Sequence, residues 1–181
     1  VVCSVPTSRA FAEAVVRAGG MPILSRTGHY YMKQAMRRNN AVFGAEHTGH
    51  IYFRETYYAE NSIRALLLVL DIMSRSGKSI SELTKPFERY VSSGEINFPM
   101  ADWAQVSEAV RRAFPDGTLD ETDGITVDFP DWRFNIRPSN TEPLLRLNVE
   151  ARDRVALQSG VRQLSRLIDG GQGGGMSQSY T

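Results

Sequence analysis

The arrangement of apolar residues changes halfway along the chain, and this change limits the folds that the sequence can adopt. In the first half, short β-branched runs (VVCSV, PILS and AVFG) alternate with longer segments whose apolar residues recur at helical spacing. These helical segments cover residues 8–18, 28–40 and 61–75. Strands that alternate with helices form an α/β layer, so we predict a mostly parallel sheet with helices for this half.

The second half contains several consecutive strands. The runs SGEINF, GITVDF, WRFNI and PLLRLNVEA predict strands, and helices are expected to begin after Asp102 and Asp153, whose side chains can cap a first turn. This order predicts an α+β domain, with an antiparallel sheet covered by two helices. We therefore expect an α/β domain at residues 1–78 and an α+β domain at residues 79–170, with the boundary falling within residues 76–90.

Two further segments are distinguished by their composition. The run ALLLVL at residues 65–70 is the longest apolar stretch and predicts a buried helix. Residues 171–181 are rich in glycine and nearly free of apolar side chains, so burial cannot offset the entropy that is lost on ordering them. We predict that this last segment is a flexible tail.

Composition also argues against several classes of function. The chain has 181 residues with 21 Lys and Arg against 20 Asp and Glu, so it lacks the basic excess that favours binding to nucleic acids or membrane surfaces. No apolar run reaches the ~20 residues of a membrane span. Cys3 is the only cysteine, which excludes an internal disulfide and is typical of a reducing compartment. We therefore expect a cytoplasmic protein with neither a nucleic-acid nor a membrane partner.

The segment RPSNTEP, residues 137–143, gathers the groups that an anion-binding loop needs. Its guanidinium offers paired donors, its serine, asparagine and threonine add polar groups, and backbone N–H groups at 139–142 could form an anion nest. Glu142 would repel a phosphate, so we expect it to point away or to pair with Arg146. A polar hairpin loop stabilised by its own side chains would contain the same residue types, and composition leaves both interpretations open.

Three motifs in this sequence resemble those of the α-D-phosphohexomutases. RPSNTEP resembles the phosphate-binding loop of that family, written R-x-S-N/G-T-E-P. GAEHTGHIYFR at residues 44–54 is similar to the sugar-binding loop G-E-x-S-G-H, and RTGHYYMKQAM at residues 26–36 is similar to the segment T-G-H-x-x-I-K. The motifs occur in the order of the family and extend over most of the chain. The resemblance is closest to the bacterial phosphomannomutase/phosphoglucomutase branch.

This resemblance implies an isomerase of carbohydrate metabolism that acts on glucose or mannose phosphates. Such enzymes move a phosphoryl group between C1 and C6 of a hexose through a bisphosphate intermediate. They have four domains, including a phosphorylated serine loop (T-x-S-H-N-P) and a magnesium loop (D-G-D-x-D-R), and neither motif occurs in these 181 residues. We therefore expect the chain to be the later part of domain three followed by domain four.

Two consequences follow from the absence of these motifs. The chain would hold no metal of its own, because the magnesium ligands of the full-length enzyme would lie elsewhere, and by itself it would be inactive. An alternative interpretation is a non-catalytic module that binds a sugar phosphate. An incomplete sheet would also expose an edge strand, through which copies of the chain could associate.

The resemblance also implies roles for individual residues. His29 matches the T-G-H histidine and is the candidate catalytic group, able to polarise a reacting oxygen or to handle a proton. His50 has no such assignment, and we predict that it is a structural hydrogen-bonding residue. The expected substrate-binding residues are Glu46 and Thr48 for the sugar hydroxyls, and Arg137, Ser139, Asn140 and Thr141 for the distal phosphate.

Overall fold

The computed structural model describes residues 1–170 and divides them into two compact units. The first unit is Val1–Tyr90, and the second begins at Val91. The division lies at the late end of the predicted boundary range, so residues 79–90, which the sequence assigned to the second domain, belong to the first unit. The predicted flexible tail at 171–181 lies outside the described residues.

The first unit is built on a five-stranded mixed sheet with the order β2-β1-β3-β4-β5. Strand β1 is parallel to both of its neighbours, β2 and β3, which confirms the predicted parallel arrangement for these three strands. Beyond β3 the pairing becomes antiparallel. The strands are β1 (Val2–Ser4), β2 (Ile23–Ser25), β3 (Phe43–Ala45), β4 (Ile51–Phe53) and β5 (Ala59–Glu60).

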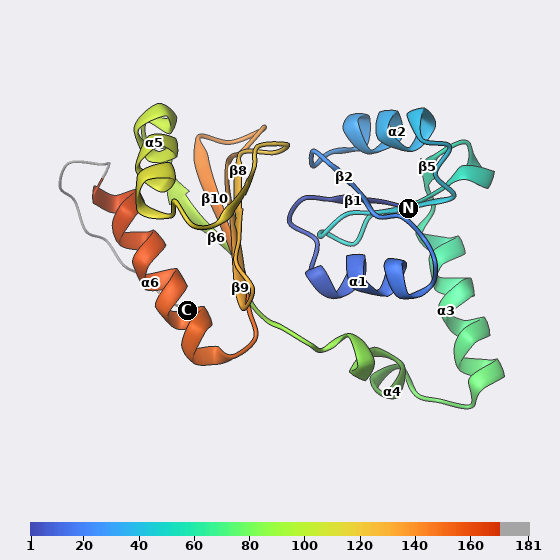
Figure 1. Ribbon diagram of the computed structural model, residues 1–181. Helices are drawn as coiled ribbons and strands as arrows, with labels where there is room; N and C mark the ends of the chain where they lie inside the picture. Colours follow the sequence, from blue (N-terminus) through green and yellow to red (C-terminus); the bar gives the residue numbers. More distant parts are fainter. Residues whose placement is uncertain (171–181) are drawn as a thin grey trace. The chain divides into compact units, whose positions relative to one another are not determined.

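Figure 1 shows α1 (Arg9–Arg17) and α2 (His29–Arg38) on opposite faces of this sheet. Neighbouring residues of a strand point to opposite faces, and β3 illustrates this alternation. The ring of Phe43 lies 6.4 Å from the ring of Phe11 in α1. Gly44 faces α2, because a β-carbon at that position would lie 2.6 Å from the sulfur of Met36. Glycine at position 44 therefore lets α2 pack closely against the sheet.

The motifs of the first unit all lie at one edge of its sheet. Since β2, β1 and β3 are parallel, their carboxyl ends meet at the same edge, where α/β proteins commonly bind ligands. The segment 26–29 follows β2, and the loop 46–50 follows β3. Two antiparallel steps make β5 parallel to β3, so Glu60, the last residue of β5, lies at this edge as well.

The apolar helix α3 (Ser62–Ser76) is exposed, so the prediction that residues 65–70 lie in a buried helix is wrong. The helix itself is confirmed, but none of its residues is buried. Apolar side chains occur around most of the helix, and no segment in the described part of the chain covers them fully. Those more than a third exposed are Ile63, Leu66, Leu67, Leu68, Val69, Leu70 and Ile72.

Short helical turns complete the first unit. The helix α4 (Ile80–Thr84) begins with the reciprocal hydrogen bonds of a capping box between Ser79 and Glu82, and η2 (Lys85–Phe87) follows it. Tyr90 then donates a 2.5 Å hydrogen bond to Glu13 of α1. This contact ties the end of the segment to α1 and explains why residues 79–90 belong with the first unit. A further turn, η1 (Arg54–Thr56), connects β4 to β5.

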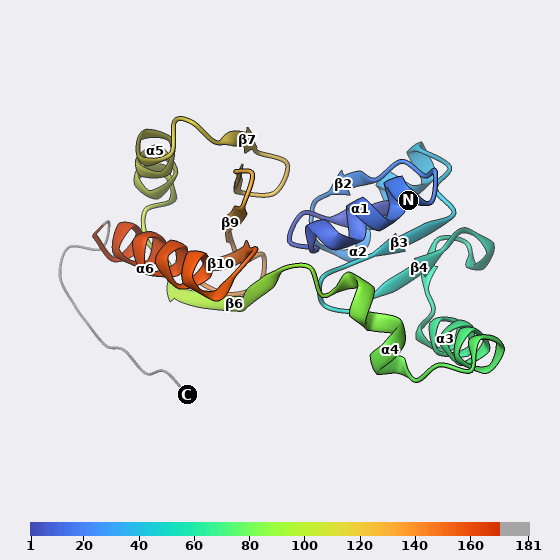
Figure 2. The ribbon, with the colours of Figure 1, turned by 60° about the horizontal axis from the view of Figure 1, so that its bottom comes forward.

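The second unit is an antiparallel sheet covered by two helices, as the sequence predicts. Its order is β6-β10-β9-β8-β7, with every neighbouring pair antiparallel. Figure 2 shows α5 and α6 beside this sheet, and side chains from both helices join one buried cluster with the sheet residues. The elements are β6 (Val91–Pro99), α5 (Trp103–Ala113), β7 (Thr118–Asp120), β8 (Ile125–Asp128), β9 (Trp132–Pro138), β10 (Leu144–Ala151) and α6 (Arg154–Gly170).

The two faces of this second sheet differ in chemistry. One face carries the apolar residues of β9 and β10, such as Ile136 and Leu147, which pack against the helices. The alternate residues face the other way and are mostly polar. Among them, Arg137 on β9 lies directly opposite Arg146 on β10 in the register of the two strands.

Among the described residues, no helix is long and apolar enough to cross a membrane.

Candidate functional site

Glu46 connects the two motif loops of the first unit. Its side chain is buried, and its Oε2 accepts a 3.1 Å hydrogen bond from the backbone N–H of Gly28. Its Oε1 accepts a short hydrogen bond from the hydroxyl of Tyr52. Burial, and then the bond to Glu46, raises the pKa of the Tyr52 hydroxyl. Both carboxylate oxygens therefore already accept a bond from the protein, and a ligand hydroxyl could use only their remaining lone pairs.

Thr48 lies in the same loop as Glu46 but is exposed. A 2.9 Å hydrogen bond from Glu46 N–H to the carbonyl of His50 closes the loop, and Gly49 adopts a φ of 89° that favours glycine. The backbone N–H of His47 donates to the Ser4 hydroxyl at 3.0 Å, which ties the loop to β1. The loop thus holds Thr48 at the surface, with its hydroxyl available to a ligand, next to a largely enclosed carboxylate.

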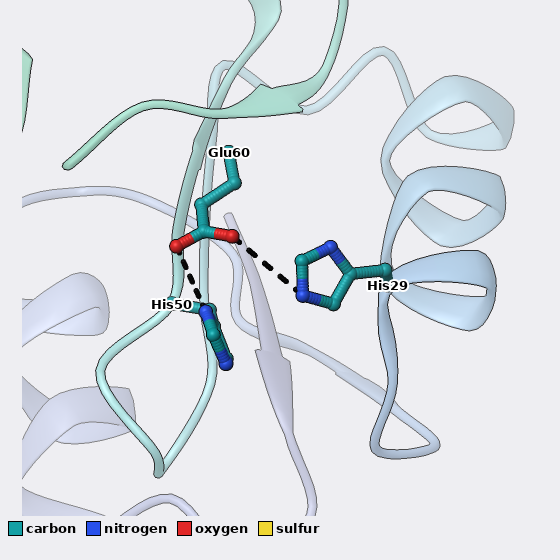
Figure 3. A group of neighbouring side chains, drawn as sticks. All are labelled: His29, His50 and Glu60. Carbon is teal, nitrogen blue, oxygen red and sulfur yellow. Dashed lines mark hydrogen bonds and ion pairs between the residues drawn. The ribbon is translucent and has the colours of Figure 1, made fainter.

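His29, His50 and Glu60 form a cluster at this edge of the sheet (Figure 3). His50 Nδ1 lies 2.8 Å from Glu60 Oε1, and His29 Nε2 lies 3.6 Å from Glu60 Oε2. The hydrogen bond with His50 is the main reason that the pKa of Glu60 lies below its ordinary value. An ionised carboxylate only accepts, so the facing nitrogen of His50 carries a proton.

The sequence assigned these three residues to different roles or to none. His29, the predicted catalytic histidine, is the first residue of α2 and is exposed. His50 makes the hydrogen bond predicted for it, but with a partner that also faces His29. Glu60 belongs to none of the three motifs. The signal available for it was weak, namely an acidic residue at the end of a short strand after the sugar-loop motif.

The hairpin loop of the second unit uses several of its own donors. The N–H of Ser139 donates to the carbonyl of Leu144 at 2.8 Å, which closes the hairpin. The Ser139 hydroxyl accepts from the N–H groups of Thr141 at 3.4 Å and Glu142 at 3.3 Å. Three of the four backbone N–H groups that could form an anion nest, those of Ser139, Thr141 and Glu142, are therefore bonded within the loop, as in the self-stabilised hairpin loop that the sequence left open. The side chains of Asn140 and Thr141 are exposed and available to a ligand.

Arg137, the predicted phosphate ligand, is buried near the end of β9, where this loop begins. Only 4% of its side chain is exposed, and its Nη2 lies 3.0 Å from Oε2 of Glu95 on β6. Arg146 bridges two carboxylates, with 3.2 Å from Nη1 to Glu95 and 2.8 Å from Nη2 to Glu142, which confirms the predicted pairing of Glu142. The side chains of Arg137, Glu95, Arg146 and Glu142 thus form a chain of three ion pairs in which positive and negative groups alternate. Glu95 was not found from the sequence because it lies 42 residues from Arg137 on another strand.

Comparisons with known proteins agree with this architecture, an α/β unit with loops at one sheet edge followed by an α+β unit. Residues 1–90 match the family model described as phosphoglucomutase/phosphomannomutase, alpha/beta/alpha domain III. Residues 95–167 match the model described as phosphoglucomutase/phosphomannomutase, C-terminal domain. The chain therefore belongs to the phosphoglucomutase/phosphomannomutase family.

Individual relatives show how much of the family's length this chain represents. A phosphomannomutase of Methanocaldococcus jannaschii is 41% identical over 168 residues, which cover 93% of this chain and 37% of that protein. A phosphoglucomutase/phosphomannomutase family protein from Burkholderia thailandensis has a TM-score of 0.80 at 26% identity, covering 97% of this chain and 38% of that chain.

A more distant structure is similar in fold. It is the Aspergillus fumigatus N-acetylphosphoglucosamine mutase in complex with GlcNAc-6P and magnesium, with a TM-score of 0.67 at 15% identity over 94% of this chain and 38% of that one. The chain thus spans somewhat more than a third of the length of these proteins.

One cluster of potential metal ligands occurs among the described residues. Among them, the one group of three or more His, Cys, Asp or Glu that could hold a metal is His29, His50 and Glu60. Magnesium prefers oxygen ligands, and two of these three residues offer nitrogen. This cluster is therefore poorly matched to magnesium.

Proposed function

We propose that this chain supplies the sugar-binding and phosphate-binding parts of a phosphohexose mutase. The enzyme would interconvert glucose or mannose 1-phosphate and 6-phosphate through a bisphosphate. Family membership supports this reaction class, and the phosphomannomutase relative supports its substrate class. Magnesium would be held by residues outside these 181, because the magnesium loop is not among them.

The observation that carries the proposal is the joining of two motif loops by Glu46. Its hydrogen bond to Gly28 joins the loop 46–50 to the segment that leads into His29, which supports a shared role for the two motifs at one sheet edge. We propose that Thr48 binds sugar hydroxyls directly and that Glu46 accepts from them with its remaining lone pairs. His29 would polarise a reacting oxygen or exchange a proton with it.

In the second unit, we propose that the hairpin loop holds the phosphate that is not being transferred. Ser139, Asn140 and Thr141 would donate to it, and Arg137 would add positive charge from beneath. Glu95 and Glu142 offset part of that charge, as both pair with arginines in the structure. A phosphate would therefore have to draw at least one arginine away from a carboxylate, or bind mainly through the hydrogen-bond donors of the loop.

Titration of the chain with glucose 6-phosphate tests the phosphate role. We expect Arg137→Ala to weaken binding by about 1.5–3 kcal/mol, the range for a hydrogen bond to a charged group. Arg133→Ala is the matched control, because Arg133 lies on the same strand and the same face but pairs with Asp128. Isothermal titration calorimetry gives the affinity, and thermal unfolding of each variant shows whether the second unit is still folded.

Two outcomes would contradict the proposal. Equal affinities for wild type and Arg137→Ala would remove Arg137 from phosphate binding, and equal losses in Arg137→Ala and Arg133→Ala would indicate a general charge effect.

A coupled mutase assay on the purified chain should show no turnover, because the serine loop is not in its sequence. Appreciable turnover would refute this expectation. Binding without any contribution to turnover, when the chain is combined with the remaining domains, would favour the sugar-phosphate-binding module.

A further inference from the structure

We propose that His29, His50 and Glu60 form a binding site for a divalent transition-metal ion of the zinc class. One ligand atom from each residue lies within 4.8 Å of the others. Figure 3 shows both imidazole rings directed at the carboxylate, which is the geometry from which all three can turn toward a shared ion. Two histidines and one glutamate are a donor set of zinc sites that keep a fourth position open.

The backbone already holds the three residues together. His29 begins α2, His50 immediately precedes β4, and Glu60 ends β5. Pairing of β4 with β5 and the 2.9 Å hydrogen bond from Asn61 N–H to the carbonyl of Ile51 fix Glu60 beside His50. Binding an ion would therefore require rotation of side chains and little movement of the backbone.

The surroundings of the three ligands suit a metal site. Tyr52 packs edge-on against His29 at 5.4 Å between ring centroids, and Ser62 donates to Glu60 at 3.3 Å. Such neighbouring contacts orient ligands and commonly strengthen metal binding. The side chains of His29 and His50 are 47% and 42% exposed, so an ion can reach them from solvent.

The chemistry of the site selects among ions. Imidazole nitrogen suits zinc, copper or nickel, whereas magnesium and calcium prefer oxygen. Binding through Nδ1 of His50 would leave the imidazole proton on Nε2, and binding would weaken as the pH falls because a protonated imidazole has no lone pair for the ion. A bound ion would also occupy the nitrogen with which His29 faces Glu60. The metal-site proposal needs only these three side chains, so it can be tested without assuming the proposed mutase function, even though it shares His29 with that function.

The chain contains an internal control for this proposal, because His47 is its third histidine and lies in the same loop as His50. Zinc chloride is titrated into the whole 181-residue chain after treatment with a chelator, and the imidazole signals of the three histidines are followed by proton NMR. We expect the signals of His29 and His50 to move together and saturate at one ion per chain, while that of His47 stays in place. Magnesium chloride should move none of them.

Variants then assign the ligands. His29→Gln, His50→Gln and Glu60→Gln should each weaken zinc binding by more than about tenfold in calorimetry, whereas His47→Gln should leave it unchanged. Zinc that leaves the signals of His29 and His50 unmoved would overturn the proposal, as would binding that survives both His50→Gln and Glu60→Gln. The NMR titration uses the unaltered chain, so the proposal remains testable even if a variant fails to fold.

Discussion

The two units bury apolar surface in different ways. In the first, no strand exceeds three residues, and one buried cluster consists of Val2, Met32, Met36, Ala41 and Tyr52. In the second, β6, β9 and β10 span seven to nine residues, and 13 buried side chains form one cluster between the sheet and both helices. The second unit therefore encloses its own core, whereas the first leaves the apolar helix α3 exposed.

This difference bears on where the proposed functional residues lie. In the first unit, they occupy loops and strand ends at one edge of a small sheet, where side chains can turn toward a ligand. In the second, Arg137 and Glu95 lie on long strands and are joined by a partly buried ion pair. We infer that the first unit adjusts its ligand contacts more readily, while the second presents its loop from a rigid support.

The largest expected difference comes from matched leucine substitutions. Leu147→Ala in the second unit should cost about 2–5 kcal/mol of stability, because Leu147 is fully buried and its loss leaves a cavity. Leu67→Ala on α3 should change stability by less than about 0.5 kcal/mol, because Leu67 is 59% exposed. Hydrogen exchange measured separately in each unit gives both values.

Chain concentration is varied in these measurements, because the exposed apolar residues of α3 could also bring copies together. A cost for Leu67→Ala as large as that for Leu147→Ala would show that α3 is covered in solution. The contrast between the two units would then fail.

A second comparison uses two glycines with positive φ. Gly124, with a φ of 73°, has no room for a β-carbon, which would lie 2.2 Å from the carbonyl oxygen of Ile136 and 2.6 Å from Cβ of Arg137. Gly77, with a φ of 67°, ends α3 in open space. Alanine at either position incurs about 1–2 kcal/mol for the left-handed backbone, and Gly124→Ala should cost clearly more because it displaces β9.

Chemical denaturation followed by tryptophan fluorescence measures the Gly124 variant, because both tryptophans, Trp103 and Trp132, lie in the second unit. Circular dichroism and hydrogen exchange measure the Gly77 variant. Equal losses at the two positions would mean that the turn before β8 can relax, and that the second unit supports its loop less rigidly than we infer.

The smallest expected effect is a pH dependence at Glu60. The pKa of Glu60 is lowered in the folded chain, so its ionised form stabilises the fold above the unfolded pKa of about 4.3. This contribution is lost as the pH falls through the lower, folded pKa. Glu60→Gln should therefore destabilise the first unit at neutral pH, and its difference from wild type should shrink in acid.

Stability of the first unit measured between neutral pH and strong acid tests this expectation. Glu88→Gln, at an exposed glutamate of the same unit, is the control. A difference between wild type and Glu60→Gln that stays constant across the acid range would show that the carboxylate charge is not what stabilises the cluster.

Much of the local structure was predictable because its causes lie close together in the sequence. The helix that follows Asp102 is confirmed, since its cap depends on residues within one turn. The pairing of Glu142 with Arg146 is confirmed for a similar reason, because the hairpin brings them together across four positions. The motifs likewise indicated the family that the comparisons then established.

Features that depend on distant residues were not predictable in this way. The two-residue strand β5 has too little pattern of its own, so the position of Glu60 beside His29 and His50 could not be expected. The burial of Arg137 depends on Glu95 of another strand. The exposure of α3 depends on which segments cover it, and its hydrophobicity alone predicted the opposite.

The sequence by itself indicated most of the helices and strands, where several helices begin, and which loops carry polar side chains. Tertiary structure alone decided which of those groups are free and which are already bound to the protein. The physical reason is the separation along the sequence over which each effect acts. Backbone propensity and capping act within a few residues, whereas burial and ion pairing depend on strands far apart in the chain.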